Sequence, residues 1–410
     1  MLRSTMLRSI LAAAAAALLS GGAHAQSIKI GILGPMAFVQ GEHHWAGAEM
    51  ARDEINKAGG INVGGKRMQI ELVRGDTNEI QSIPDATNAI ERVITREKAD
   101  FLVGGFRSEA VLAMQEVAAD YKKIFLGAGS AHPQLGMRVE QSYERYKYWF
   151  RVTPPNSNDL GKTLVGVLGS VAGQIRKELN RPTPKIAIVA EKAIWVEPIV
   201  KALPPVFQKM QMELVGTWQP SATATDVTAE LAAIDRAGAD IVFTLLSGPV
   251  GITVGRQMGE RGMKAVAFGI NVEAQKEEFW NAAAGKAEYV STIDTFAEVE
   301  ITPKTIPFVR AFRARFNKPP TYNAGTYDAI HLLKEAIEKA GSTDSDKLVP
   351  VLEKTSYVAG FGVLEFDKRH DPVWAPGKNT GIAVQWQGGK KVPFWPPQIK
   401  GMQPFKLPAR

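Results

Sequence analysis

Short apolar runs alternate with helical repeats through most of this chain, and that alternation limits the folds it can adopt. In the first third, apolar runs of strand length are separated by stretches in which apolar residues recur every three or four positions. We expect strands over 28–33, 68–73, 101–103 and 124–126, with helices over 45–58, 84–94 and 108–119. Repeated strand–helix–strand units imply a parallel sheet with helices on its faces.

The same pattern restarts near residue 151 and predicts a second lobe of the same kind. Its expected strands are 186–189, 214–215, 241–246 and 265–268. The chain ends differently, with expected helices over 304–316 and 327–340 and short strands over 363–366, 380–386 and 391–394. Gly388-Gly389 predicts a tight turn between the last two strands. The predicted fold class is α/β, with two doubly wound parallel-sheet lobes.

The N-terminal segment predicts export from the cytoplasm. Arg3 and Arg8 are the only charges before an apolar run over 10–19, and Ala23-His24-Ala25 follows as a small-x-small cleavage site. These features are typical of a secretory signal peptide over residues 1–25, and the run is too short to span a bilayer. With cleavage after Ala25, we expect a periplasmic protein that begins at Gln26. The chain has no cysteine, so its stability cannot depend on disulfides.

Motifs for catalysis are missing from the sequence. There is no G-x-S-x-G serine motif, and the glycine-rich segment 127–132 lacks the third glycine of a dinucleotide loop. His43 and His44 are adjacent, without the spacing that puts a zinc pair on one helix face, and we expect them in a solvated loop. The net charge of +7 is scattered rather than gathered into a nucleic-acid-binding stripe. We therefore expect no enzyme activity, no cofactor, no metal and no nucleic-acid partner.

Two loops rich in small residues follow consecutive predicted strands, at 104–108 and 127–131. In an open parallel sheet, ligands bind at the carboxyl ends of the strands. Small residues there allow backbone N–H groups to approach an anion, and helix N-termini add positive potential. Ser108 could therefore donate to a ligand and cap the following helix, or it could act as a cap alone.

Several segments give the chain a family likeness. They are 28–36 (IKIGILGPM), 47–51 (GAEMA), 54–61 (EINKAGGI), Gly64-Gly65-Lys66 and Asp76. In these segments the chain resembles the periplasmic solute-binding proteins of branched-chain amino-acid ABC transporters, the leucine-binding family. The resemblance extends over nearly the whole mature chain. It implies a type I periplasmic binding fold, in which two lobes joined by a three-segment hinge close on a small ligand.

The resemblance also implies partners and lobe boundaries. The expected partners are a small-molecule ligand and an ABC permease of the inner membrane, and the protein is expected to be a monomer. The first lobe would comprise 27–150 plus 296–357, and the second 151–295 plus 358–395, with 396–410 as a surface tail.

Carried over from the family, Ser108 and the loop Ser130-Ala131 would hold the carboxylate of the ligand. Ala131 stands where the family has a threonine, so Ser130 or backbone N–H groups would serve instead. The first loop of the family is shorter here and leaves Gln40 nearby.

Aromatic residues would form the remaining walls. Trp195 corresponds to the aromatic that closes from the second lobe, and Tyr322 to an aromatic on the first. With Phe106, they could contact a ring or a hydrophobic tail, or they could pack as ordinary core.

One departure bears on the ligand. The acidic residue that pairs with the ligand ammonium in the family corresponds to Asn271 here, and a buried ammonium without a carboxylate partner is costly. Either Glu273 supplies the charge or the ligand lacks an amine; Asn271 could also simply cap a helix over 271–284. The resemblance implies a solute-binding protein for branched-chain or other hydrophobic amino acids. Aromatic or aliphatic acids or amides, or a sensory role, are the alternatives.

Overall fold

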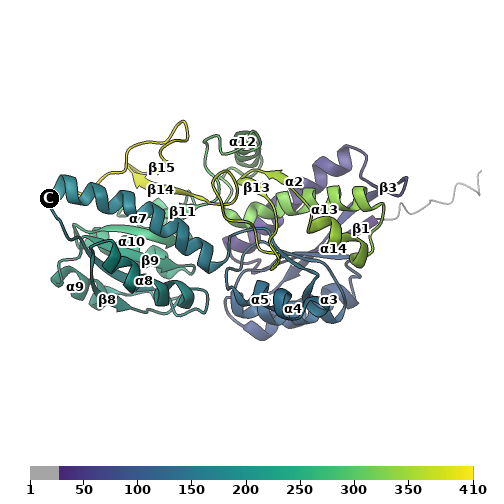
Figure 1. Cartoon of the computed structure of the whole chain (residues 1–410), viewed down its shortest axis with the longest axis horizontal. Helices are drawn as coiled ribbons and strands as arrows, with labels where there is room; N and C mark the ends of the chain where they lie inside the picture. The colour runs from purple at the N-terminus through teal and green to yellow at the C-terminus, as the bar shows by residue number, and fades with distance from the viewer. Residues whose placement is uncertain (1–26, 410) are drawn as a thin grey trace, which may run out of the picture.

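The computed structural model describes residues 27–409 and consists of two α/β lobes side by side (Figure 1). The expected signal peptide and its cleavage site lie outside these residues. In the part of the chain described, no helix is long and apolar enough to cross a membrane.

The first lobe is built on a six-stranded sheet of order β2-β3-β1-β4-β5-β6. Its strands are β1 (Ser27–Gly34), β2 (Ile61–Val63), β3 (Lys66–Asp76), β4 (Phe101–Gly104), β5 (Phe125–Gly127) and β6 (Trp149–Arg151). All pair in parallel except β2, which forms a hairpin with β3. The carboxyl ends of β1, β4, β5 and β6 therefore meet at one edge of the sheet.

Helices cover both faces of this sheet, because its central strands are apolar on both sides. One face packs against α2 (Val39–Lys57) and α13 (Thr326–Ala340), with α12 (Thr305–Phe316) and α14 (Ser345–Leu352) beside them. The other face packs against α3 (Ile83–Thr95), α4 (Ser108–Asp120) and α5 (Gln134–Gln141), followed by the single turn α6 (Tyr143–Tyr146). Figure 1 shows the two helix layers above and below the sheet.

The second lobe contains a parallel sheet of order β10-β9-β7-β8. Its strands are β7 (Lys185–Ala190), β8 (Glu213–Trp218), β9 (Ile241–Leu246) and β10 (Val266–Asn271), and its helices are α7 (Ser157–Leu179), α8 (Glu197–Lys209), α9 (Thr228–Arg236) and α10 (Val250–Glu260). An antiparallel sheet, β11 (Ser291–Asp294), β14 (Ile382–Gln387) and β15 (Lys390–Trp395), lies beside β10. Gly388 and Gly389 form the β14–β15 turn with φ of 58° and 76°, as predicted.

The chain crosses between the lobes three times, and the third crossing lies later than expected. Residues 357–366, including β12 (Tyr357–Ala359) and β13 (Gly362–Leu364), pack into the first-lobe core. Their apolar side chains, such as Phe361 and Leu364, are buried there. The expected boundary at 357/358 is therefore wrong, and the chain enters the second lobe after Asp371, which pairs with Arg151 at the end of β6.

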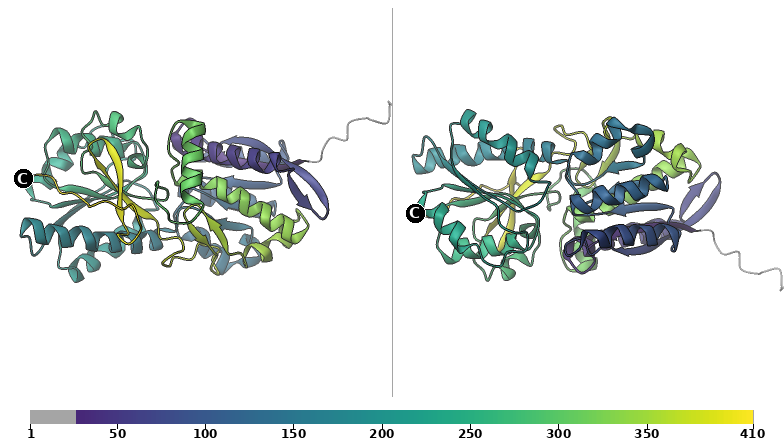
Figure 2. Two further views of the ribbon diagram at one scale, coloured as in Figure 1. Left: turned by 90° about the horizontal axis from the view of Figure 1, so that it is seen from above. Right: turned by 90° about the horizontal axis from the view of Figure 1, so that it is seen from below.

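The C-terminal residues follow the surface of the second lobe, where Figure 2 shows them beside β14 and β15. Phe405 is buried against Phe394, with ring centroids 5.0 Å apart, and Gln385 Nε2 donates to Lys406 O at 2.9 Å. The segment expected as a surface tail is thus anchored to the second lobe.

Candidate functional site

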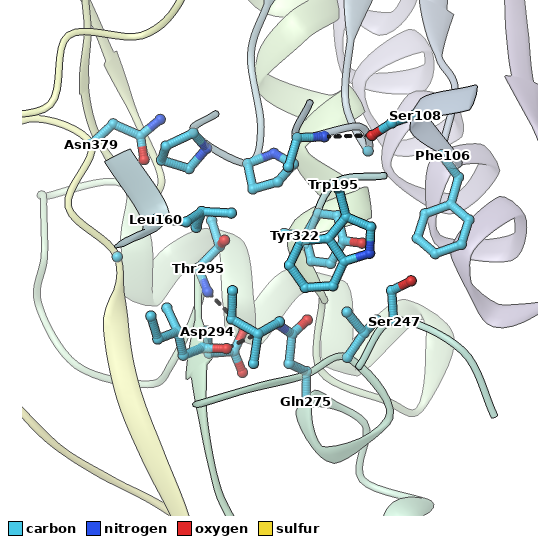
Figure 3. Close-up of a pocket in the computed structure, with 18 of the residues that line it drawn as sticks. Phe106, Ser108, Leu160, Trp195, Ser247, Gln275, Asp294, Thr295, Tyr322 and Asn379 are labelled. Atoms are coloured by element: carbon cyan, nitrogen blue, oxygen red, sulfur yellow. Dashed lines mark hydrogen bonds between the residues drawn. The ribbon is translucent and has the colours of Figure 1, made fainter. Parts of the chain in front are cut away.

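A pocket lies between the lobes, at the carboxyl end of the first-lobe sheet (Figure 3). It encloses about 730 Å³, part of which is continuous with bulk solvent. Most of its lining is apolar or aromatic, which is typical of small-molecule sites. The lining residues used below are Phe106, Arg107, Ser108, Glu109, Ala131, Trp195, Ser247, Gln275, Asp294, Tyr322 and Asn379.

Glycines bring the two first-lobe loops close together. Gly104, with φ of 112°, ends β4 so near β1 that a Cβ would lie 2.1 Å from Leu33 O. A Cβ on Gly129 would lie 2.0 Å from Gly105 O in the neighbouring loop. A side chain at Gly129 would separate the two loops, and one at Gly104 would push the end of β4 away from β1, so both glycines set the geometry of the first-lobe wall.

Ser108 joins these two loops instead of capping a helix. It is the first residue of α4, and its Oγ accepts hydrogen bonds from Ala131 N at 3.3 Å and His132 N at 3.2 Å. The expectation that its side chain caps the helix is wrong, since no side chain caps α4. Both bonds use Oγ as an acceptor, which leaves its O–H proton to donate into the pocket.

A buried carboxylate, Glu79, lies behind the first of these loops. It accepts from Thr77 Oγ1 at 2.9 Å and from the backbone N–H groups of Phe106 and Arg107, the latter at 2.8 Å. Burial raises the pKa of Glu79 to about 7, against the lowering effect of these donors. These two N–H groups are therefore engaged by Glu79 and are not available to an anion in the pocket.

Arg151 positions the second loop. Its guanidinium donates to the carbonyl oxygens of Ser130 and His132, the latter at 3.0 Å, and its Nε donates to Asp371 Oδ1 at 2.6 Å. Ala131 lines the pocket between the two held carbonyls, whereas Ser130 does not line it and its buried Oγ has no partner. This position gives no support to the expectation that the Ser130 hydroxyl replaces the family threonine.

On the second lobe, Trp195 lies in the middle of the pocket, next to Tyr322 from the first lobe (Figure 3). The Trp195 Nε1 donates to Glu191 Oε1 at 3.0 Å, and its carbonyl accepts from Ser157 Oγ at 2.7 Å. Trp195 and Tyr322, which the family resemblance placed near the ligand, and Phe106 all line the pocket.

The two residues expected near a ligand amine face elsewhere. Asn271 Nδ2 donates to Gly251 O of α10 at 3.0 Å, and its Oδ1 accepts from Ala274 N of the short turn η1 (Glu273–Gln275) at 3.3 Å, so its side chain connects α10 to η1. Glu273 pairs with Lys276 at 2.5 Å. Neither lines the pocket, so this arrangement gives no support to their expected contact with the ligand. The expected helix over 271–284 is only η1 and the single turn α11 (Phe279–Ala282).

Gln40 and the two histidines also differ from expectation. Gln40 is buried on α2, outside the pocket lining. His43 and His44 are buried on the same helix rather than in a solvated loop, with His43 Nδ1 2.9 Å from Thr321 Oγ1 and His44 Nε2 2.9 Å from Ala128 O. Burial lowers their pKa values to about 3 and about 4. Within residues 27–409, no cluster of His, Cys, Asp or Glu could hold a metal.

All charged side chains of the pocket lining are paired. Asp294 lies 2.7 Å from Lys391 Nζ, and burial raises the pKa of this carboxyl. Arg107 pairs with Glu109 at 3.2 Å, and Glu109 Oε1 also accepts from Ile194 N of the second lobe at 3.1 Å. The last bond connects the lobes, and the pocket presents no unpaired charge from residues 27–409.

Several lining residues were not predicted from the sequence. Ser247 follows β9, so it occupies the same strand-end position as the residues predicted in the first lobe. Gln275, Asp294 and Asn379 lie on a short turn and on two of the crossings, where no local pattern marks them.

Comparisons with known proteins agree with this architecture. The chain is 26% identical to an amino acid binding protein of Pseudomonas aeruginosa, over 89% of this chain and 92% of that one. It is 24% identical to a Leu/Ile/Val-binding protein homolog of Brucella suis, over 95% of this chain and 97% of that one.

Solved structures share the fold. The branched-chain amino acid binding protein LivJ of Streptococcus pneumoniae, in complex with isoleucine, gives a TM-score of 0.73 at 24% identity, over 89% of this chain and 98% of that one. A solute-binding protein of R. palustris in complex with benzoate gives a TM-score of 0.72 at 20% identity, over 90% of this chain and 95% of that one. These likenesses and the match of a periplasmic binding protein model to residues 27–390 confirm the two-lobe fold. The chain belongs to the periplasmic binding protein family.

Proposed function

We propose that this protein is the periplasmic solute-binding component of an ABC importer, and that it acts by binding alone, without catalysis. It is exported, cleaved after Ala25, and delivers its ligand as a monomer to an inner-membrane permease. The names of its relatives support this role, since they are amino acid and Leu/Ile/Val-binding proteins.

The ligand is a small carboxylate with an apolar body, a class that includes the hydrophobic amino acids. One observation carries this proposal: an interlobe pocket lined by Phe106, Trp195 and Tyr322, with the Ser108 hydroxyl at the start of α4. The aromatic side chains would contact the apolar body, while Ser108 and the N-terminus of α4 would stabilise the carboxylate. Contacts from both lobes favour the closed arrangement when ligand is bound.

The Ser108 hydroxyl provides a direct test. Because Ser108→Ala removes a hydrogen bond to a charged group, carboxylate binding should weaken by about 1.5–3 kcal/mol, or roughly ten- to a hundredfold. Calorimetric titrations with leucine, phenylalanine, 4-methylpentanoate and benzoate would first identify a ligand and then measure the loss. Ser130→Ala is the matched control, since its hydroxyl lies outside the pocket and should leave affinity unchanged. Equal affinity in Ser108→Ala and wild type, with both folded, would contradict this role.

A further inference from the structure

Gln275 presents an unused acceptor in the second-lobe wall of the pocket. Its side chain is 4% exposed, its Nε2 donates to Ile293 O at 2.9 Å, and its Oε1 has no partner. Figure 3 shows the side chain extending from the second lobe toward Trp195 and Tyr322. A buried acceptor without a partner is costly, so a bound ligand that donates a hydrogen bond to it would be favoured.

Lys391, which contacts the backbone of Gln275, already has two acceptors. Lys391 Nζ donates to Gln275 O at 2.6 Å and to Asp294 Oδ2 at 2.7 Å. The other oxygen of Asp294 accepts from Thr295 N at 2.7 Å. If Asp294 turned to pair with a ligand ammonium, Lys391, whose side chain is 12% exposed, would lose its carboxylate partner, which is unfavourable.

Among the described residues that line the pocket, the second-lobe wall offers a ligand a neutral acceptor, and its one carboxylate, Asp294, is paired with Lys391. Glu191 has no ion-pair partner among residues 27–409, but it lies outside the lining and accepts from four donor groups. An ammonium in the pocket would therefore need a carboxylate that already has partners, whereas a hydroxyl would satisfy Gln275 Oε1 at no cost in charge. We infer that the site prefers carboxylic acids that lack an amine and carry a hydroxyl, and that Gln275 determines this specificity. The inference rests on the proposed function and narrows its ligand class.

Paired ligands test the preference in the wild-type protein. By calorimetry, 4-methylpentanoate should bind at least tenfold more tightly than leucine, and 3-phenylpropanoate at least tenfold more tightly than phenylalanine. Of 2-hydroxy-3-phenylpropanoate and 3-(4-hydroxyphenyl)propanoate, at least one should bind more tightly than 3-phenylpropanoate.

Two variants then identify Gln275 as the cause. Gln275→Met removes the acceptor and should abolish the gain from the hydroxyl, while 3-phenylpropanoate binding stays within about threefold. Gln275→Glu introduces a carboxylate and should shift the preference toward the amino acid at least tenfold. Gln40→Glu is the matched control, because Gln40 is equally buried and also has an unpartnered Oε1, but lies outside the pocket lining. It should leave the preference unchanged.

The outcomes separate the inference from the function on which it rests. Tighter wild-type binding of leucine or phenylalanine than of their amine-free partners would overturn the inference and leave the solute-binding function standing. A hydroxyl gain that persists in Gln275→Met would also overturn it. If no carboxylate of the panel binds the wild type, the proposed function itself fails. If Gln275→Glu does not fold, the ranking of ligand affinities in the wild type and the affinities of Gln275→Met still test the inference.

Discussion

The two walls of the pocket are each organised by a buried charged side chain, but the charge is balanced in different ways. In the first lobe, Arg151 donates to two loop carbonyls and is neutralised by Asp371. In the second, Glu191 accepts from Trp195 Nε1, from Ser247 N and Oγ, and from Gly248 N, and it has no ion-pair partner among residues 27–409. Each arrangement positions a loop at the end of a strand. In the first lobe the charge is balanced by an ion pair, and in the second by the dipoles of hydrogen-bond donors. The two walls should therefore respond differently to substitution.

The largest effect is expected at the first wall. Asp371→Ala leaves the Arg151 guanidinium buried without its partner, which should lower the free energy of unfolding by about 3–5 kcal/mol. Urea denaturation followed by circular dichroism would measure it. Arg151→Met combined with Asp371→Ala removes both charges and should cost less than Asp371→Ala alone. If Asp371→Ala lowered the free energy of unfolding by less than about 1 kcal/mol, Asp371 would not be what neutralises Arg151 in this wall.

A smaller effect is expected at the second wall. Glu191→Gln keeps the shape but turns an amide N–H₂ toward backbone donors, so some of them lose their acceptor at a cost of about 1–3 kcal/mol. No charge is left unpaired, so the loss should be smaller than in Asp371→Ala. The same urea measurement compares them, with the exposed Glu213→Gln as a control. A loss equal to that of Asp371→Ala would remove the distinction between the walls.

The smallest effect is a pH dependence at Glu79, a second carboxylate held by dipoles. Its pKa is about 7 in the folded protein and near 4.3 when unfolded, so between these values the unfolded chain ionises first. Glu79 therefore destabilises the fold progressively as pH rises through this window, by at most about 1.4 kcal/mol per pH unit. The stability of wild type minus that of Glu79→Gln should fall by about 1 kcal/mol from pH 5.5 to 6.5. His43, His44 and Asp328 also titrate abnormally, but they cancel in this difference. A flat difference would contradict the raised pKa.

The two walls also differ in how far their residues could be predicted from the sequence. The first wall was predictable because Phe106, Ser108 and Ala131 directly follow apolar strands, and local pattern shows where such strands end. Trp195 and Tyr322 came from the family resemblance. The position of Gln275 in the second-lobe wall was not predictable. Gln275 lies on the three-residue turn η1, which is held in place by hydrogen bonds with Asn271 and Lys391. The first contact is a local side-chain bond to the turn and the second joins segments far apart in the chain, and hydrophobic periodicity carries no information about either.

The late third crossing was missed for a related reason. Residues 357–366 form a short hairpin whose apolar side chains suit either lobe, and only packing against α13 and its neighbours assigns them to the first. The strands themselves were predicted well, since β1, β4, β7 and β9 are apolar runs buried on both faces.

The interlaced path of the chain has a consequence for how the protein acquires its structure. The first lobe begins with β1 but needs residues up to 366 to complete its core, and the second lobe needs β14, β15 and Phe405. Contacts between such distant segments form slowly, because a long loop must close before any of them stabilises the fold. Neither lobe can finish folding until nearly all of the chain is available. During most of its synthesis, the nascent chain therefore lacks segments that the finished core of each lobe contains.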